Sequence, residues 1–510
     1  MRVQFKENKD TKSDTVLAFV YEGEELKGAG SDLDKKTASF ISAHVSKSRK
    51  FSGKFGQSLE INALPEAKDS SYERAIIVGL GEKEDLTVGK LLTLGGKTQV
   101  AINKTDADKV DVLTRGIKWP KPLSETDAVL ALGEGVSLRS YKFDRYKTKH
   151  ATSSKGADSL TFVCDDAKEK TKAFEIVSKR VKGVNLARDL VTEPPNKLYP
   201  ESYAQRIKEE LEPLGVKVTI FDYKKLQKMG AGGIIAVGQG SARKPCMVVM
   251  EYNGVGKKSS KPALGLVGKG ITFDTGGYNI KSDGALFGVY DMKFDMGGSA
   301  AVVGAMKVLA GRKAKAHVVS AVSLAENSVS SEAFLPSDVI KTLSGQTVEI
   351  LNTDAEGRLV MSDALWYLQD TYKVDKIMDL ATLTGAVIVS LGFEYCGVFS
   401  DSQELVDQLY VASEKTGEKV WHMPMDPAWE KGLKSDIADF NNHPKPSGPA
   451  ASSKAAQFLR RFIQNGVQWA HLDVAGPVWH KSATDLCPKG ATGYGVRLLD
   501  RFISDFYEEK

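Results

Sequence analysis

Strand-like and helix-like patterns alternate from about residue 246 to residue 416, and this alternation limits the folds open to the chain more than any other feature. The strand-like segments are CMVVMEYNG, ALGLVGKG, HVVSAVSLA, TVEILNT, KIMDLATL and CGVFSD. Helical patterns cover residues 297–309, 359–372 and 402–416, and another begins at Gly385. Apolar strands that alternate with helices predict an α/β fold with a mostly parallel sheet covered by helices on both faces.

The length of 510 residues is more than one ordinary hydrophobic core accommodates, so we expect two domains. Residues 1–168 mix strand-like runs such as AIIVGLG with helical patterns, which predicts a smaller N-terminal α/β domain. A helical pattern follows over residues 169–192 and ends at TEPPNKLYP, because two adjacent prolines cannot continue a helix. We therefore expect a linker helix at residues 169–192 and a larger C-terminal domain at residues 193–510.

The composition argues against several classes of protein. The chain has 70 Lys and Arg residues against 65 Asp and Glu residues, and this small excess does not favour binding to nucleic acid or to a membrane surface. No segment reaches the roughly 18 apolar residues that a membrane-spanning helix needs, and the N-terminus lacks an apolar signal core. The four cysteines are far apart and form no CxxC pair, which indicates neither a structural zinc site nor a disulfide framework. We expect a cytoplasmic protein.

Acidic and lysine side chains gather in three segments that we expect at strand ends. The residues concerned are Lys269, Asp274, Lys281, Asp295, Asp354 and Glu356. Ligands of open α/β sheets bind outside the carboxyl ends of the strands, where these segments should meet. Carboxylates packed together repel one another unless a cation neutralises them, so the cluster predicts a metal site. Oxygen donors without nearby histidine or cysteine suit Mg²⁺ or Mn²⁺, and Zn²⁺ accepts the same carboxylates in a two-metal site.

Each segment alone has a simpler explanation, because Asp, Glu and Gly are common in turns and helix caps and single lysines are usually surface side chains. Only their joint occurrence at strand ends favours a functional site. A phosphate-binding loop is excluded, since the lysine of GLVGKGIT comes too early and lacks the required spacing to Ser or Thr. Two alternatives remain open, a metal-dependent phosphohydrolase and a nucleic-acid-binding or scaffolding protein on the same fold.

Several motifs resemble one family, the leucyl aminopeptidases, which are cytosolic dinuclear-metal exopeptidases. The unbroken octapeptide NTDAEGRL at residues 352–359 is the most specific of them. The others are GKGITFDTGGYNIK, MKFDMGGSAA, GVNLARDL, WAHLDVAG and GATGYGVRLL, so the resemblance covers roughly residues 180–500. The tyrosine in GGYNIK and the long gap from Lys281 to Asp295 are similar to plant and protist members. Residues 193–510 would then form the catalytic metallopeptidase domain.

The resemblance implies two divalent ions per subunit, Zn²⁺ or Mn²⁺ with Mg²⁺ as a further candidate. Their implied ligands are Lys269, Asp274, Asp295, Asp354 and Glu356. Asp274 and Glu356 would bridge the ions, and Lys269 would have to be neutral to donate a lone pair. Lys281 and Arg358 are the implied catalytic residues. Lys281 would stabilise an oxyanion, and a bicarbonate ion held by Arg358, Gly357 and Leu383 would carry the proton.

The activity implied by the resemblance is release of N-terminal residues, preferably Leu and other apolar residues, from peptides by a metal-activated water. Positions that match the family's substrate pocket are Met292, Asn352, Ala355, Thr382, Gly385, Ala475 and Val478. The resemblance also implies a homohexamer with peptide substrates as its partners. Neither a membrane nor a nucleic acid is expected as a partner.

Overall fold

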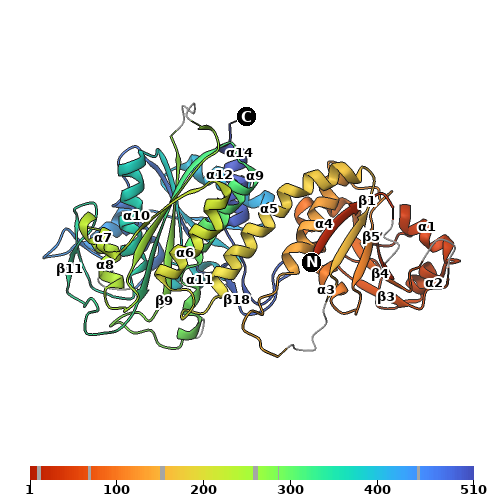
Figure 1. Ribbon diagram of the computed structural model, residues 1–510, viewed down its shortest axis with the longest axis horizontal. Coiled ribbons are helices and arrows are strands. Elements are labelled where there is room, and N and C mark those ends of the chain that lie inside the picture. Colours follow the sequence, from red (N-terminus) through yellow and green to blue (C-terminus); the bar gives the residue numbers. More distant parts are fainter. Residues whose placement is uncertain are drawn as a thin grey trace. The chain divides into compact units, whose positions relative to one another are not determined.

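The computed structural model describes residues 1–8, 13–66, 71–149, 156–256, 262–284, 287–444 and 448–509. The chain divides into two compact units (Figure 1). The first contains Met1–Val181 together with Ser482–Lys489, and the second contains Lys182–Lys481 and Gly490–Lys510. Helix α5, Ala167–Thr192, continues across the division between Val181 and Lys182.

The first unit is built on a six-stranded sheet in the order β1-β6-β5-β2-β4-β3. Its strands are β1 Arg2–Lys6, β2 Thr15–Tyr21, β3 Ser58–Asn62, β4 Arg74–Gly81, β5 Lys109–Leu113 and β6 Ser159–Val163. Only β3 runs antiparallel to its neighbour among these strands. Its helices are α1 Gly28–Lys36, α2 Phe40–Lys47, α3 Val88–Ile102, α4 Glu125–Arg139 and the first part of α5.

Helices α3 and α4 of the first unit approach closely because glycines lie at their contact. A Cβ atom on Gly95 would lie 2.2 Å from the carbonyl oxygen of Leu132, and one on Gly135 would lie 1.9 Å from that of Leu92. Helix α4 begins with a capping box, in which the Ser124 hydroxyl accepts from the N–H of Asp127 and the Asp127 carboxylate accepts from the N–H of Ser124.

The second unit contains an eight-stranded sheet in the order β15-β14-β17-β13-β9-β10-β8-β7. Its strands are β7 Lys217–Phe221, β8 Cys246–Asn253, β9 Leu264–Asp274, β10 His317–Asn327, β13 Lys376–Ala381, β14 Cys396–Phe399, β15 Val420–Met423 and β17 Gln468–Asp473. The four central strands, β17, β13, β9 and β10, are mutually parallel. The carboxyl ends of these strands therefore share one edge of the sheet, as the sequence predicts.

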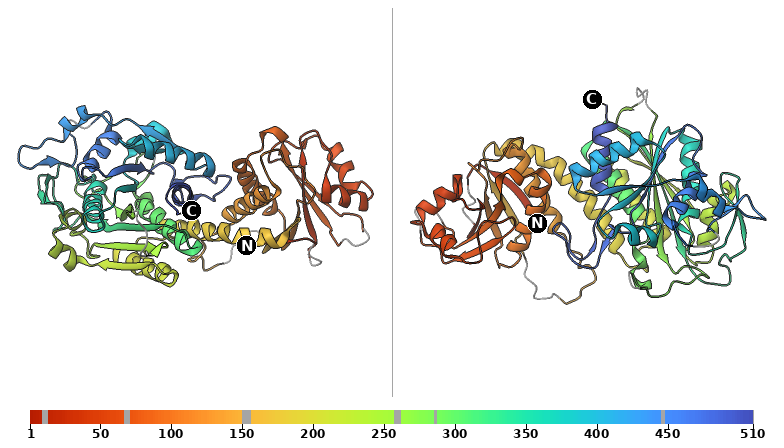
Figure 2. Two further views of the ribbon diagram at one scale, coloured as in Figure 1. Left: turned by 90° about the horizontal axis from the view of Figure 1, so that it is seen from above. Right: turned by 180° about the vertical axis from the view of Figure 1, so that it is seen from behind.

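Helices cover both faces of this sheet (Figure 2). Helices α9 Gly297–Arg312, α12 Gln403–Thr416 and α14 Val496–Phe506 pack in one layer, and α8 Gly232–Gly238, α10 Gly357–Tyr372 and α13 Ala451–Arg460 pack in the other. Further helices are α6 Pro200–Leu211, α7 Tyr223–Met229 and α11 Gly385–Leu391. Helix α9 lies close to the sheet, since a Cβ atom on Gly268 would lie 2.5 Å from the Cα atom of Ser299. The predicted fold class is confirmed.

Two local predictions are wrong. Lys269 is expected at the end of a strand, but β9 continues to Asp274 and the lysine lies inside it. The strand-like segment before Asp354 is predicted in the main sheet, but β12 Thr347–Glu349 belongs to a small separate sheet with β11 Val339–Lys341 and β16 Phe440–Asn441. A short apolar run indicates a strand without indicating which sheet it joins. In the described part of the chain, no helix has the length and apolar character to cross a membrane.

Candidate functional site

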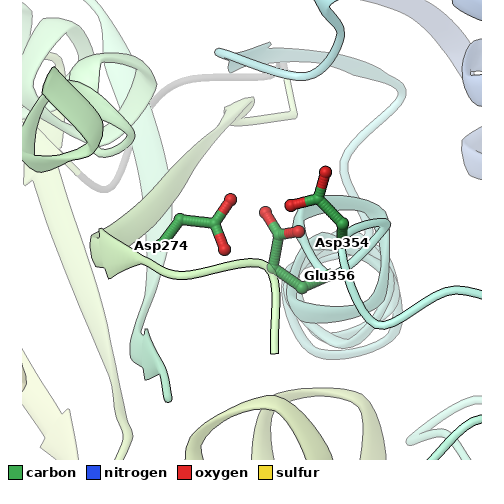
Figure 3. Close-up of side chains that lie close together, drawn as sticks. All are labelled: Asp274, Asp354 and Glu356. Carbon is green, nitrogen blue, oxygen red and sulfur yellow. The ribbon is translucent and has the colours of Figure 1, made fainter. Parts of the chain in front are cut away.

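Three carboxylates face one another between the end of strand β9 and the segment that directly precedes helix α10 (Figure 3). Each of Asp274, Asp354 and Glu356 offers an oxygen atom, and these atoms all lie within 4.8 Å of one another. Asp274 and Glu356 are buried, and Asp354 is partly exposed. Such a group of oxygens suits a hard divalent cation.

Asp274 is oriented by hydrogen bonds at the end of its strand. Its Oδ1 atom accepts from the backbone N–H of Gly276 at 2.9 Å and from Asn327 Nδ2 at 2.8 Å. The turn that follows needs glycine, because Gly276 and Gly277 have φ angles of 87° and 63°. Asn327 ends the neighbouring strand β10 and also donates to the carbonyl oxygen of Thr353 at 3.1 Å. The ends of two strands therefore hold Asp274 against the segment that carries Asp354 and Glu356.

The loop after β9 is tied to the loop before α10 by one reciprocal pair. The N–H of Thr353 donates to Asn279 Oδ1 and the N–H of Asn279 donates to Thr353 Oγ1, both at 2.8 Å. Thr353 Oγ1 also donates to the carbonyl oxygen of Gly276 at 2.7 Å. These bonds fix the separation of Lys281, on the first loop, from Asp354, on the second.

Lys269 joins two further carboxylates from inside strand β9. Its Nζ atom lies 2.8 Å from Asp295 Oδ2 and 2.8 Å from Glu356 Oε1, and it donates to the carbonyl oxygen of Thr382 at 2.9 Å. The Thr382 hydroxyl donates to Asp295 Oδ1 at 2.7 Å. The structure thus brings all five predicted metal ligands into one cluster, although their sequence positions span 88 residues from 269 to 356.

Lys281 bridges the other side of the cluster. Its Nζ atom lies 2.8 Å from Asp274 Oδ2 and 2.6 Å from Asp354 Oδ1. Burial acts to lower the pKa of both Lys269 and Lys281, but the carboxylates around them raise each pKa above its ordinary value. Both side chains are therefore ammonium groups in the ion-free protein. The neutral amine that a ligand lysine requires would follow only from the positive charge of bound metal ions.

The cluster contains more acidic than basic groups, because four carboxylates face only two ammonium groups. Burial, followed by the charges of Asp274 and Glu356, raises the pKa of Asp354 to about 7. Burial likewise raises the pKa of Asp295 well above its ordinary value. Glu356 Oε2 is buried and has no hydrogen-bond partner among the described residues. Divalent cations would supply both the missing charge and the missing partners.

Arg358 lies in the first turn of α10, with 6% of its surface exposed. Burial lowers the pKa of Arg358 to about 10, so the guanidinium remains charged at neutral pH. Its Nη1 atom donates to the carbonyl oxygen of Asn442 at 2.9 Å, and its buried Nε has no hydrogen-bond partner in the described residues. A small anion such as bicarbonate fits this free donor. The N–H of Leu383, a second predicted bicarbonate contact, donates instead to Asp473 Oδ1 at 3.1 Å.

A cavity of about 280 Å³ lies directly against the cluster. Six of the seven predicted pocket residues line it, and they are Met292, Asn352, Ala355, Thr382, Gly385 and Ala475. Val478 is not on the cavity wall. It is buried and packs against Gly297, where a Cβ atom would lie 3.1 Å from Cγ1 of Val478. Gly357 is also away from the wall and packs against Lys269, where a Cβ atom would lie 2.5 Å from Cε.

Three residues that position the site do not appear among the predicted site residues. They are Asn327, Thr353 and Asp473. Asp473 is fully buried at the end of β17, and its oxygens accept from the N–H of Leu383 and from the Thr384 hydroxyl. A polar residue at the carboxyl end of an apolar strand is the signal that could have identified both Asn327 and Asp473.

Comparison with protein-family models gives two matches. The cytosol aminopeptidase family, catalytic domain, matches residues 185–500, and the cytosol aminopeptidase family, N-terminal domain, matches residues 17–150. A probable cytosol aminopeptidase of Ehrlichia ruminantium (strain Gardel) is 43% identical, over 98% of this chain and 96% of the relative. A probable cytosol aminopeptidase of Wolbachia pipientis wMel is 42% identical, over 97% of this chain and 94% of the relative.

Solved structures show the same architecture. A mutant of tomato leucine aminopeptidase superposes with a TM-score of 0.84 at 30% identity, covering 99% of this chain and 96% of that one. The bottromycin maturation enzyme BotP in complex with Mn superposes with a TM-score of 0.82 at 28% identity, covering 96% of this chain and 99% of that one. Because both family models match in order and relatives align along nearly its whole length, the chain belongs to the cytosol aminopeptidase family, whose members are metal-dependent aminopeptidases.

Proposed function

We propose that the protein is a two-metal aminopeptidase that releases Leu and other apolar residues from the N-terminus of peptides. The observation that carries this proposal is the close approach of Asp274, Asp354 and Glu356 beside a cavity. A carboxylate cluster alone also suits a phosphohydrolase. The family match and the apolar side of the cavity wall favour a peptide substrate instead.

Five side chains would hold the two ions, namely Lys269, Asp274, Asp295, Asp354 and Glu356. When bound, two divalent ions acidify a water molecule and bind the free α-amine of the substrate. The excess of four carboxylates over two ammonium groups supports this assignment, as does the buried Glu356 Oε2, which has no hydrogen-bond partner among the described residues. Bound cations would supply the missing charge and the missing partner. The solved structure of a similar protein that contains Mn supports manganese as one candidate, beside Zn²⁺ and Mg²⁺.

Two cationic side chains act on the substrate from the cavity wall. Lys281 keeps its proton because Asp274 and Asp354 surround it, so its ammonium group can stabilise negative charge on the carbonyl oxygen of the cleaved bond. Arg358 cannot accept a proton at neutral pH, but its Nε, which has no hydrogen-bond partner in the described part of the chain, can hold bicarbonate. The bicarbonate would carry the proton between water and the leaving amine.

The experiment that tests this function compares Leu-amide with N-acetyl-Leu-amide. We expect release of Leu only from the unblocked substrate, loss of activity with a chelator and recovery with added Mn²⁺ or Zn²⁺. Cleavage of the blocked substrate, or activity that ignores the chelator, would contradict the proposal. Hydrolysis of a phosphate ester in place of the amide would establish the phosphohydrolase alternative.

Two wider expectations belong to the same proposal. The family resemblance supports a homohexamer, which light scattering on the purified protein would test. The names of the relatives, cytosol aminopeptidases, support a cytoplasmic location. Fractionation of cells that express the tagged protein would test that location.

A further inference from the structure

The cavity beside the carboxylates has an apolar side that includes residues absent from the predicted pocket, and Phe287 is one of them. Phe287, Phe294, Met292 and Ile388 line the cavity together with small residues. Phe287 lies on the loop between Lys281 and the short helix Val289–Phe294, and its side chain is half-buried. It is therefore a large side chain that contributes to the wall and remains partly open.

The ring of Phe287 is held in one orientation by its neighbours. It packs edge-to-face on Phe294, with centroids 4.7 Å apart, and on Phe393, with centroids 5.8 Å apart and planes at 89°. The Nζ atom of Lys481 lies over the ring, 5.5 Å from its centroid. These contacts favour a fixed ring, because both edge-to-face packing and a cation over the ring depend on orientation.

Hydrogen bonds among the described residues near Phe287 limit its movement as well. Its carbonyl oxygen accepts from the N–H of Gly284 at 3.1 Å. The N–H of Gly288 donates to Asp291 Oδ2 at 3.1 Å, and the N–H of Val289 donates to Asp283 Oδ1 at 3.0 Å. These contacts of Phe287 therefore present its ring as a pre-formed surface, which lowers the cost of ordering the ring when a substrate binds.

The remaining apolar wall leaves space for a bulky substrate side chain. Gly385, Ala386 and Ala475 all line the cavity, and none carries more than a methyl group. A Cβ atom added to Gly385 would meet no atom of the described residues within 4 Å, so among these residues the glycine borders open space. A fixed aromatic ring in a pocket with small residues suits a flat side chain that packs against that ring.

We infer that Phe287 is a specificity-determining residue and that it selects peptides whose first residue is aromatic. The inference rests on the proposed function, since only an aminopeptidase places the first residue of a peptide substrate in this cavity. An aromatic pair adds stabilisation beyond the area that it buries, whereas Leu gains only from burial. We expect the wild-type protein to release Phe from Phe-amide with a higher kcat/KM than Leu from Leu-amide.

The test compares the kcat/KM ratio of Phe-amide to Leu-amide in matched variants. Phe287→Leu should lower the ratio about three- to ten-fold, because it keeps an apolar side chain and removes the ring. Phe287→Tyr keeps the ring and should keep the ratio. Tyr290→Leu is the control, since Tyr290 is an aromatic residue of the same segment that is 74% exposed and is not on the cavity wall.

A pocket-filling variant gives an independent reading. Gly385→Val should depress kcat/KM for both Phe-amide and Leu-amide much more than for Ala-amide, because it occupies the open space. Equal kcat/KM values for Phe-amide and Leu-amide in the wild type would overturn the inference while leaving the aminopeptidase function intact. The same holds if Phe287→Leu leaves the ratio of the two values unchanged. A wild-type protein that cleaves none of the three amides would instead refute the proposed function.

Discussion

Gly357 leaves the room that Lys269 occupies, since a Cβ atom on Gly357 would lie 2.5 Å from Cε and 2.8 Å from Nζ of the lysine. Alanine is otherwise favourable at a helical position, so a substitution here acts through this contact and not through helix propensity. We expect Gly357→Ala to displace the amine from Asp295 and Glu356 and to weaken metal binding at least ten-fold. Isothermal titration with Mn²⁺ measures this effect. Gly385→Ala should bind metal normally, because the added Cβ atom would meet no atom of the described residues within 4 Å.

Arg358→Lys tests the proposed anion site. Lysine keeps the positive charge but lacks the planar set of donors that holds an oxyanion in two places. We expect kcat to fall by at least ten-fold while metal content, measured by elemental analysis, stays at the wild-type level. An unchanged kcat would remove Arg358 from the mechanism.

Lys281→Gln removes the ammonium group between Asp274 and Asp354 and keeps a side chain of similar length. Loss of one group that stabilises an oxyanion costs about 10²- to 10³-fold in rate. We expect that fall in kcat with little change in KM for Leu-amide. A rise in KM at constant kcat would mean that Lys281 binds substrate without acting in the reaction.

Substitution of Asp473 tests whether the stability of the loop that carries Thr382 depends on one buried carboxylate. Its oxygens accept from the N–H groups of Leu383 and Ala475 and from the Thr384 hydroxyl. Asp473→Ala leaves one buried and two part-buried donors without this acceptor and should lower the free energy of unfolding by about 3 kcal/mol. Asp473→Asn should cost less than about 1 kcal/mol, because the Thr384 hydroxyl can accept from the new amide. Urea denaturation of both variants measures the difference.

We expect the stability of the protein to depend on pH through Asp363. It is fully buried in α10 and accepts from the N–H groups of Ile234 and Leu343. Burial raises its pKa from 3.8 to about 7, although these hydrogen bonds act to lower it. Because the folded pKa lies above the unfolded one, the contribution to stability is complete below about pH 4 and is lost as the pH rises through 7.

Asp363→Asn cannot titrate and provides the comparison. We expect the wild-type protein to lose stability relative to this variant between about pH 4 and pH 7, by up to roughly 4 kcal/mol. Urea denaturation of both proteins at about pH 4 and pH 8 measures the change. Parallel stability curves for the two proteins would show that Asp363 has an ordinary pKa.

Much of the site follows from patterns that are local in the sequence. Asp274 follows an apolar run and precedes two glycines, which predicts its place at the end of a strand. The lysine inside the strand is different, because the side chain of Lys269 is fixed by partners that lie 26 and 87 residues further on. The contacts of Asn327 with Asp274 and of Asp473 with Leu383 likewise join distant segments. Pairings of this kind depend on tertiary packing, which no local pattern encodes.

The eight residues Ser482–Lys489, which belong to the first unit, limit how the protein can be divided. The carbonyl oxygen of Asp485 lies where a side chain on Gly96 would be, and Lys97 pairs with the Asp485 carboxylate at 2.9 Å. Expression of residues 1–181 alone would expose the surface that this segment covers. Conversely, a catalytic fragment that starts after α5 would carry a segment without its binding surface. To separate the two units, residues Ser482–Lys489 must therefore be replaced by a short linker in the fragment of the second unit and joined to the fragment of the first unit.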